Sequence, residues 1–403
     1  MRPKVYIAIP VLNEIDNLPG LIKDLNAQQV VNWEAVFCIN QPDEWWGNSE
    51  KRALCENNQA SIKWLTALDQ ENIHIIDKSS PGKGWIGKNH GVGWARKTAM
   101  DTVSVKAEND DLILSMDADT RYPPEYLTSV IEASNRHKTA SGMSAPYYHP
   151  LTGDEVTDRC ILRYEIYMRN YALNMFLINN PYAFSAIGSG MACKAADYRK
   201  VGGMTPKMSG EDFYFVQKLR KSGNIIVDSN TYIYPASRFS DRVYFGTGPA
   251  MIKGRAGNWE SYPIYHNDAF QLIKQTYDAF DSLFSEDIPS PMDTFLSSVT
   301  RGEPVWQPLR ENSATADNFK KACMQRIDAL RILQFLKETN ADYPLHNEQR
   351  LNAFLSGQFE SGRDLNQILT DLDFEKTSVG DLNMIRNFMA QQELKLQKEK
   401  GVV

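Results

Sequence analysis

Two aspartates one residue apart, Asp117 and Asp119, are the most informative chemical groups in the sequence. They follow an apolar run, Leu112 to Met116, that is typical of a short buried strand. Acidic groups at the carboxyl end of a strand lie where open α/β sheets bind ligands. Because carboxylate oxygens suit Mg²⁺ or Mn²⁺, the pair could hold a divalent metal that carries a nucleotide diphosphate. The alternative interpretation is that they cap the helix that follows.

A second acidic pair, Glu211 and Asp212, opens a predicted helix over residues 209–223. Acids in a first turn stabilise the helix dipole, which is the simpler explanation of the pair. The chemical explanation is general-base catalysis, because an alcohol is a poor nucleophile until a carboxylate removes its proton. The sequence around the pair leaves both interpretations open.

Two further stretches could contact phosphate. The glycine-rich loop at residues 82–99 contains Lys88 and Asn89 and leads into a helix, so its backbone N–H groups could face an anion. It matches neither GxGxxG after the first strand nor GxxxxGK[ST], which argues against a dinucleotide fold or a P-loop. Arg238 and Arg242, four residues apart, could bind a diphosphate in a closing loop, or form surface ion pairs.

The elements that must position these groups alternate along the first 260 residues. Strands are predicted at 5–10, 34–40, 73–77, 111–119, 139–145, 224–228 and 231–235, with helices between most of them, and residues 184–194 are predicted to be a strand or a loop. This alternation predicts an α/β fold with a mostly parallel sheet flanked by helices. Residues 261–403 have helical spacing only, so the chain is predicted to contain a domain at 1–260 and a helical C-terminal extension of unknown role. The tail after residue 394 is predicted to be solvated and loosely ordered.

Aromatic side chains are frequent between Tyr164 and Phe184. Such a stripe is more often core than a sugar-stacking surface. Trp45, Trp46 and Trp85, in predicted loops, are better candidates for stacking on a ligand.

Composition limits the class of protein. The chain of 403 residues has 42% hydrophobic and 23% charged residues and a net charge of -6, which gives no reason to expect a nucleic-acid partner. Its five cysteines lack CxxC spacing and are expected to be reduced, as in a cytoplasmic protein. The sequence contains no apolar stretch of about 18 residues, so no transmembrane segment is predicted. Peripheral contact with the inner face of a membrane, and an oligomer, stay open.

Four segments occur in the order found in a known family: IAIPVLNE, SMDAD, GSGMACKAADYRKVGG and GEDFYFVQKLRKSG. Over about residues 4–245 the chain resembles inverting family-two glycosyltransferases of the GT-A fold, the nucleotide-diphospho-sugar transferase superfamily. The resemblance implies a nucleoside-diphosphate sugar donor, a carbohydrate or lipid-linked acceptor, and Mn²⁺ or Mg²⁺ as the cofactor.

The resemblance also implies roles for particular residues. Asp117 and Asp119 match the metal-binding DxD, with Asp117 on the nucleotide side, and Asp212 matches the catalytic base, with Glu211 beside it. The remaining residues implied for nucleotide-sugar binding are Pro10, Asn13, Glu14, Asn40, Lys88, Asn89, Gly188, Ser189, Gly190, Arg238 and Arg242.

The chain also departs from the family pattern. The second strand ends in Asn40 where the family has an acidic residue that reads the base, and no histidine lies between His149 and His266 to complete the metal site. The Gln-x-x-Arg-Trp signature of polymer synthases is absent, which favours transfer of single sugars. The alternative function is a catalytically silent nucleotide-sugar-binding protein that acts as an assembly partner. A third function, nucleotidyl transfer, would need an arginine-containing glycine-rich loop after the first strand, and this sequence lacks such a loop.

Overall fold

The computed structural model describes residues 3–30, 32–228, 230–241 and 246–403. The chain divides into two compact units, of which the first comprises residues 1–164, 184–259 and 397–402. The second comprises residues 165–183, 260–396 and 403. The chain thus passes from one unit to the other beside the predicted boundary at residue 260, but the second unit also includes residues 165–183. The division into functional domains stays a prediction.

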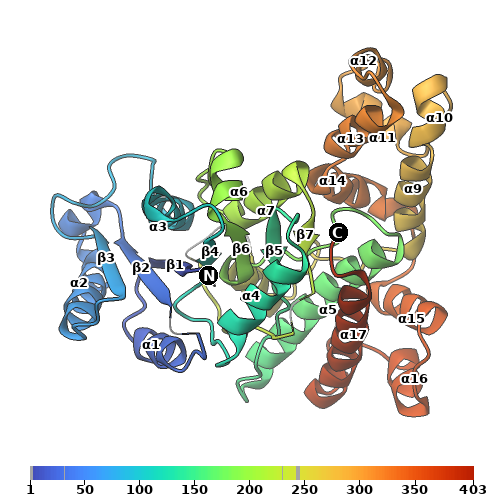
Figure 1. Ribbon diagram of the computed structural model, residues 1–403. Helices are drawn as coiled ribbons and strands as arrows, with labels where there is room; N and C mark the ends of the chain where they lie inside the picture. Colours follow the sequence, from blue (N-terminus) through green and yellow to red (C-terminus); the bar gives the residue numbers. More distant parts are fainter. Residues whose placement is uncertain (1–2, 31, 229, 242–245) are drawn as a thin grey trace. The chain divides into compact units, whose positions relative to one another are not determined.

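Among the described residues of the first unit, seven strands form one sheet in the order β3-β2-β1-β4-β6-β5-β7 (Figure 1). Strand β6 is antiparallel to β4 and β5, and the other pairs are parallel. The predicted α/β class with a mostly parallel sheet is therefore confirmed. The strands are β1 (Val5–Val11), β2 (Trp33–Asn40), β3 (Ile73–Lys78), β4 (Leu112–Ser115), β5 (Gly142–Ser144), β6 (Met191–Lys194) and β7 (Ile225–Ile226).

The strand order brings three loops to one edge of the sheet. The chain winds from β1 outward to β3 and then returns to β4, which pairs with the other side of β1. The carboxyl ends of β1 and β4 therefore meet at a topological switch point, where such sheets bind ligands. Because β6 is antiparallel, its first residue, Met191, pairs with Ser115 at the end of β4. The loop before β6 thus joins the same edge.

Helices cover both faces of this sheet. α1 and α4 lie on one face, and α3, α6 and α7 lie on the other (Figure 1). α1 shows why: its buried residues Leu18, Leu21, Ile22 and Leu25 recur at helical spacing and form one apolar stripe. The helices of this unit are α1 (Leu18–Asn26), α2 (Arg52–Ala67), α3 (Val92–Lys106), α4 (Tyr126–Arg136), α6 (Ala195–Lys200), α7 (Glu211–Ser222) and α8 (Thr247–Arg255), with 3-10 turns η1 (Asp43–Gly47), η2 (Ser49–Lys51) and η3 (Gly188–Gly190).

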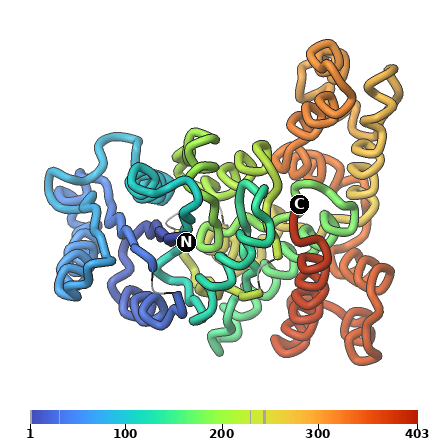
Figure 2. The backbone as a smooth tube through the Cα atoms, viewed as in Figure 1, coloured from blue at the N-terminus to red at the C-terminus, as the bar shows by residue number. Residues whose placement is uncertain are grey.

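The second unit is helical in its described residues. Helix α5 (Glu155–Leu177) contributes its second half, and the backbone tube shows the run of helices that follows residue 260 (Figure 2). Tyr167 and Tyr171 contact Tyr262 and Phe270 ring to edge, so this part of the aromatic stripe packs within the unit, as its spacing predicts. The other elements are α9 (Asn267–Asp278), α10 (Phe280–Ser285), α11 (Asp293–Val299), α12 (Gln307–Glu311), α13 (Ala316–Arg326), α14 (Ala329–Thr339), η4 (Asn340–Asp342), α15 (Asn347–Gln358), α16 (Arg363–Thr370) and α17 (Val379–Lys400).

Two sequence expectations are wrong. Residues 231–235 form isolated bridges, Tyr147 with Ile233 and Arg121 with Tyr234, where a strand was expected. The tail is also ordered within the first unit: the carbonyl of Gly401 accepts hydrogen bonds from the backbone N–H groups of Val227 and Asp228, and Val402 forms an isolated bridge with Ile226 of β7. The polar composition of the tail gave no sign of this pairing, because backbone groups and not side chains form it.

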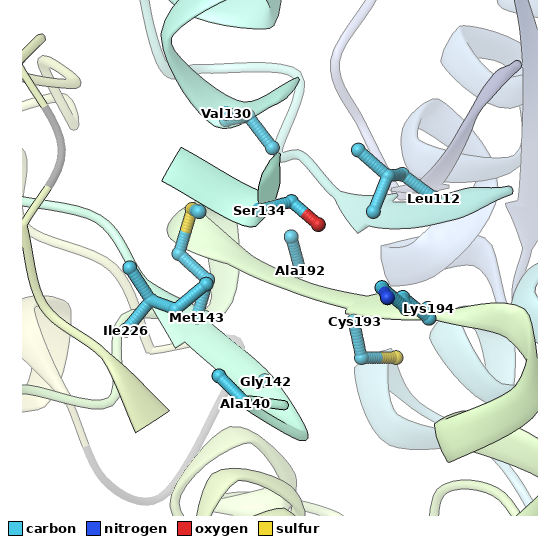
Figure 3. Close-up of a pocket in the computed structure, with 10 residues that line it drawn as sticks. All are labelled: Leu112, Val130, Ser134, Ala140, Gly142, Met143, Ala192, Cys193, Lys194 and Ile226. Atoms are coloured by element: carbon cyan, nitrogen blue, oxygen red, sulfur yellow. The ribbon is translucent and has the colours of Figure 1, made fainter. Parts of the chain in front are cut away.

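A small cavity lies between the sheet and α4 (Figure 3). Its lining includes Leu112, Met143 and Ile226 from the strands and Val130 and Ser134 from the helix. It holds about one water molecule at most. None of the acidic groups predicted to do chemistry lines it, so it is a packing gap beneath α4 and not the functional site.

The cysteines and helices add two facts. All five cysteines are buried free thiols. In the part of the chain that the structure describes, no helix combines the length and the apolarity that crossing a bilayer requires.

Candidate active site

Five carboxylates gather at the edge of the sheet where β1 and β4 end. Glu14 comes from the loop after β1, and Asp117 and Asp119 come from the loop after β4. Glu211 and Asp212 come from the first turn of α7, which an arginine links to the β4 loop. The structure therefore brings together the acids of three separate sequence segments.

Arg96 of α3 joins the β4 loop to α7. Its Nη2 donates to Oδ1 of Asp117, and its Nη1 donates to Oε1 of Glu211. The Arg96 side chain is only 2% exposed, so its pair with the buried Glu211 is shielded from water, whereas Asp117 is 31% exposed. A Cβ atom on Gly188, in the loop before β6, would lie 2.6 Å from Nη1 of Arg96, so a side chain at this position would displace the guanidinium group. The 188–190 loop thus forms one wall of the Arg96 pocket.

Arg238 makes the second bridge. Its Nη2 pairs with a carboxylate oxygen of both Glu14 and Asp119, and so joins the β1 loop to the β4 loop. Glu14 also accepts a hydrogen bond from Nδ2 of Asn17 and is 5% exposed. The Arg238 and Asp119 side chains are 31% and 21% exposed, so this bridge faces solvent more than the Arg96 bridge does.

Glu211 and Asp212 lie at the start of α7. Gly210 precedes them with φ +73°, a left-handed conformation in which a side chain is strained, so the turn into the helix favours glycine here. Oδ1 of Asp212 accepts the backbone N–H of Phe213. Desolvation raises the pKa of both carboxyl groups, and Arg96 opposes this rise. Such a shift is typical of acids that exchange protons near neutral pH, and it also occurs in structural clusters.

The site groups five carboxylates with two guanidinium groups among the described side chains. Buried charges are costly unless they are paired, so the two arginines hold the acids of separate loops together.

Asp117 and Asp119 fit a divalent metal in chemistry and access. Both are hard oxygen donors, and their side chains are 31% and 21% exposed, so an ion can reach them. Across residues 3–30, 32–228, 230–241 and 246–403, no three His, Cys, Asp or Glu side chains form a metal-ligating group. An ion held by Asp117 and Asp119 would take its other ligands from phosphate oxygens and water.

Several predicted donor-binding residues lie outside this cluster. Lys88 and Asn89 are exposed in the loop before α3, and no described contact links their side chains to the carboxylates. Pro10 is buried within β1, and Asn13 is exposed with φ +57°. Ser189 and Gly190 are buried with Gly188 in the turn before β6. Arg242 lies outside the residues that the structure describes.

Asn40 makes internal hydrogen bonds. Its Nδ2 donates to the carbonyl of Val11, and its Oδ1 accepts from the indole N–H of Trp85 at 3.3 Å. It is only 2% exposed. The Lys78 ammonium group lies 5.3 Å from the centre of the half-buried Trp85 ring. At the end of β2, the surface that a base would meet is therefore Trp85 and Lys78 more than Asn40.

Two residues of the site were missed in the sequence. Arg96 had a signal: it lies at the buried spacing of Gly93, Ala99 and Val103 on α3, and a buried arginine requires acidic partners. Tyr122, which contacts the β4 loop through its hydroxyl group, had no signal, because an aromatic residue near a strand end is ordinary core.

No protein-family model matches the chain, and no curated protein matches its sequence. Among solved structures, the chain is similar to residues 1–349 of S. aureus TarS, with 12% identity, a TM-score of 0.37 and coverage of 96% of this chain and 91% of that chain. It is also similar to the mannosyltransferase PcManGT from Pyrobaculum calidifontis in complex with GDP-Man and Mn²⁺, with 13% identity, a TM-score of 0.40 and coverage of 100% and 87%. Likenesses this weak carry no argument for family or activity.

Proposed function

We propose that this protein is a metal-dependent inverting glycosyltransferase of the GT-A type, which moves a single sugar from a nucleoside-diphosphate sugar to a hydroxyl group. The observation that carries the proposal is the grouping of Asp117 and Asp119, at the switch point of the sheet, with the acids of α7 and with two arginines. A metal–diphosphate complex supplies positive charge at the ion and presents phosphate oxygens that arginines can bind. The site offers partners for both parts.

Asp117 and Asp119 would hold Mn²⁺ or Mg²⁺, which when bound stabilises the charge that develops on the departing diphosphate. Arg238 is already beside Asp119 and would contact the diphosphate with its guanidinium group. Trp85 and Lys78 would face the base, with Asn40 orienting the indole ring. The exposed Lys88 and Asn89 would approach the donor from the loop before α3.

Asp212 would act as the general base. An acceptor hydroxyl group attacks the anomeric carbon as Asp212 takes its proton, and the diphosphate leaves from the opposite face of the sugar, which inverts the configuration. Arg96 stays protonated and holds Glu211 and Asp117 in place while the charge moves. Desolvation raises the pKa of Asp212 and makes it a stronger base than an exposed aspartate.

The test is Mn²⁺ binding measured by electron paramagnetic resonance, with and without UDP, GDP, ADP or CDP. The proposal predicts that one or more of these nucleotides tightens Mn²⁺ binding, and that Asp119→Ala weakens this ternary binding by about 10- to 100-fold. Asp293→Ala, which removes a carboxylate of the second unit, is the matched control and should leave binding unchanged. The proposal is wrong if no nucleotide changes Mn²⁺ binding in the wild type.

The catalytically silent binding protein is the second candidate. It is favoured by the absence of a third metal-ligating side chain among the described residues. Both candidates bind nucleotide, so only turnover separates them. Release of nucleoside diphosphate from a panel of nucleotide sugars would support the transferase, and tight binding without release over hours would support the silent protein.

A further inference from the structure

The hydroxyl group of Tyr122 joins two loops of the site. It accepts the backbone N–H of Asp117 at 3.1 Å and donates to the backbone carbonyl of Ser189 at 3.0 Å. Tyr122 is 2% exposed, so neither backbone group has water as an easy alternative partner. One hydroxyl group therefore fixes the loop after β4 to the turn before β6.

These bonds are part of a closed ring of contacts. The carboxylate of Asp117 is bound to Arg96, and Arg96 packs against Gly188, which precedes Ser189. From Ser189 the ring returns through Tyr122 to the backbone of Asp117. Asp117 is thus held at both ends, by Arg96 at its side chain and by Tyr122 at its amide, so its orientation depends on both partners.

We propose that Tyr122 is a positioning residue, whose hydroxyl group sets the direction in which Asp117 presents its carboxylate to a metal–diphosphate complex. The inference rests on the proposed function for the identity of the ligand, although the hydrogen bonds themselves do not. Removing the hydroxyl group leaves the Asp117 N–H and the Ser189 carbonyl without it, and both loops can then shift. Metal affinity responds strongly to such indirect contacts, typically by about 10- to 100-fold.

Tyr126, four residues further on, provides a matched control. Its ring centre lies 5.2 Å from that of Tyr122, and it is fully buried. In the described part of the chain its hydroxyl group has no hydrogen-bond partner. Tyr122→Phe and Tyr126→Phe therefore delete the same atom from neighbouring tyrosines, and only the first deletion removes bonds to the site.

The experiment measures Mn²⁺ binding to both full-length variants in the presence of UDP and GDP, by electron paramagnetic resonance. We expect Tyr122→Phe to weaken ternary binding by about 10- to 100-fold and Tyr126→Phe to bind as the wild type does. Equal binding by Tyr122→Phe and the wild type would overturn the positioning role. Equal losses in both variants would also overturn it, because the loss would then reflect packing.

If Tyr122→Phe does not fold, a second measurement on the wild type still tests the inference. The hydrogen bond to Tyr122 predicts slow hydrogen exchange at the Asp117 amide of the wild type, and rapid exchange there would overturn the inference. Failure of the proposed function gives a different result. In that case the wild type binds no Mn²⁺–nucleotide, while its Asp117 amide still exchanges hydrogen slowly. That result would reject a metal-positioning role and leave only the structural bond.

Discussion

Arginine–carboxylate clusters occur in both units of this protein, and their access to solvent differs. In the second unit, Arg169 and Arg386 pair with Glu165 and Glu393 across α5 and α17. Each of these four residues is at most 2% exposed. The cluster is therefore shielded from water, as is typical of a structural ion network.

The cluster of the first unit has the same chemistry with more access to solvent. Arg96 and Arg238 face five carboxylates, and Asp117 and Asp119, the pair proposed to hold a metal, are partly exposed. A cation can reach carboxylates that are open to solvent, whereas those of the second unit are shielded. The comparison teaches that access, more than the number of ion pairs, distinguishes a candidate binding site from a structural network.

The largest expected effect is a loss of catalysis in the cluster of the first unit. Asp212→Asn keeps the shape of the side chain and removes its basicity, so we expect release of nucleoside diphosphate from an active nucleotide sugar to fall by about 10²- to 10⁴-fold in kcat. Nucleotide binding should change little, because Asp212 contacts neither arginine directly. Steady-state kinetics with an acceptor panel measure this, and unchanged turnover would remove Asp212 as the base.

Substitution in the buried cluster of the second unit should change stability instead. Glu165 accepts from both arginines, so Glu165→Gln leaves two buried guanidinium groups with less compensation. We expect the free energy of unfolding in urea to fall by about 3–5 kcal/mol, with no change in Mn²⁺ binding. Glu155→Gln is the control on the same helix, because Glu155 forms an exposed pair with Arg159 and should cost about 1 kcal/mol at most.

If Glu165→Gln and Glu155→Gln lost the same stability, the second cluster would not be a structural network. If Glu165→Gln weakened Mn²⁺ binding while the protein stayed folded, the separation of roles between the two clusters would be wrong.

Arg238 tests the open side of the site. Its guanidinium group forms ion pairs with Asp119 and Glu14 and would therefore compete with a metal for their carboxylate oxygens. Without nucleotide, Arg238→Ala should bind Mn²⁺ about two- to fivefold more tightly. With nucleoside diphosphate present, the variant should bind less tightly than the wild type, because a phosphate partner is lost. Arg52→Ala, which breaks an exposed pair with Glu56, is the control, and a shift in the same direction under both conditions would contradict the role.

The comparison also shows what could be predicted from sequence. Buried strands such as β1 and β4 follow from continuous apolar runs, and aspartates directly after a strand must lie at its carboxyl end. Partners were beyond prediction because they depend on contacts between distant segments: Arg96 reaches Asp117 across 21 residues and Glu211 across 115. Asn40 shows the same limit, since its residue type suggested a base contact while Val11 and Trp85 occupy its amide.

The smallest expected effect concerns the pKa of Asp212, which desolvation raises from its ordinary value of 3.8. The folded protein therefore holds this proton more tightly than the unfolded chain does, and the stability that the group contributes is lost as pH rises through the raised pKa. Asparagine carries no charge to desolvate. Asp212→Asn should thus be more stable than the wild type at pH 7, and the difference should shrink toward pH 4.

Glu34 supplies the opposite sign in the same unit. Desolvation raises the pKa of its carboxyl group, but hydrogen bonds from Lys106 and Lys4 outweigh it together with their charges and lower the pKa to about 2. The stabilising effect of Glu34 is therefore present at neutral pH and is lost as pH falls toward 2. Glu34→Gln should therefore destabilise the protein at pH 7, with a difference that closes in acid. Urea unfolding of both variants at several pH values measures the two slopes. Destabilisation by Asp212→Asn at pH 7 would mean that the carboxylates around Arg96 are balanced by groups of the fold, and the site would then resemble the cluster of the second unit.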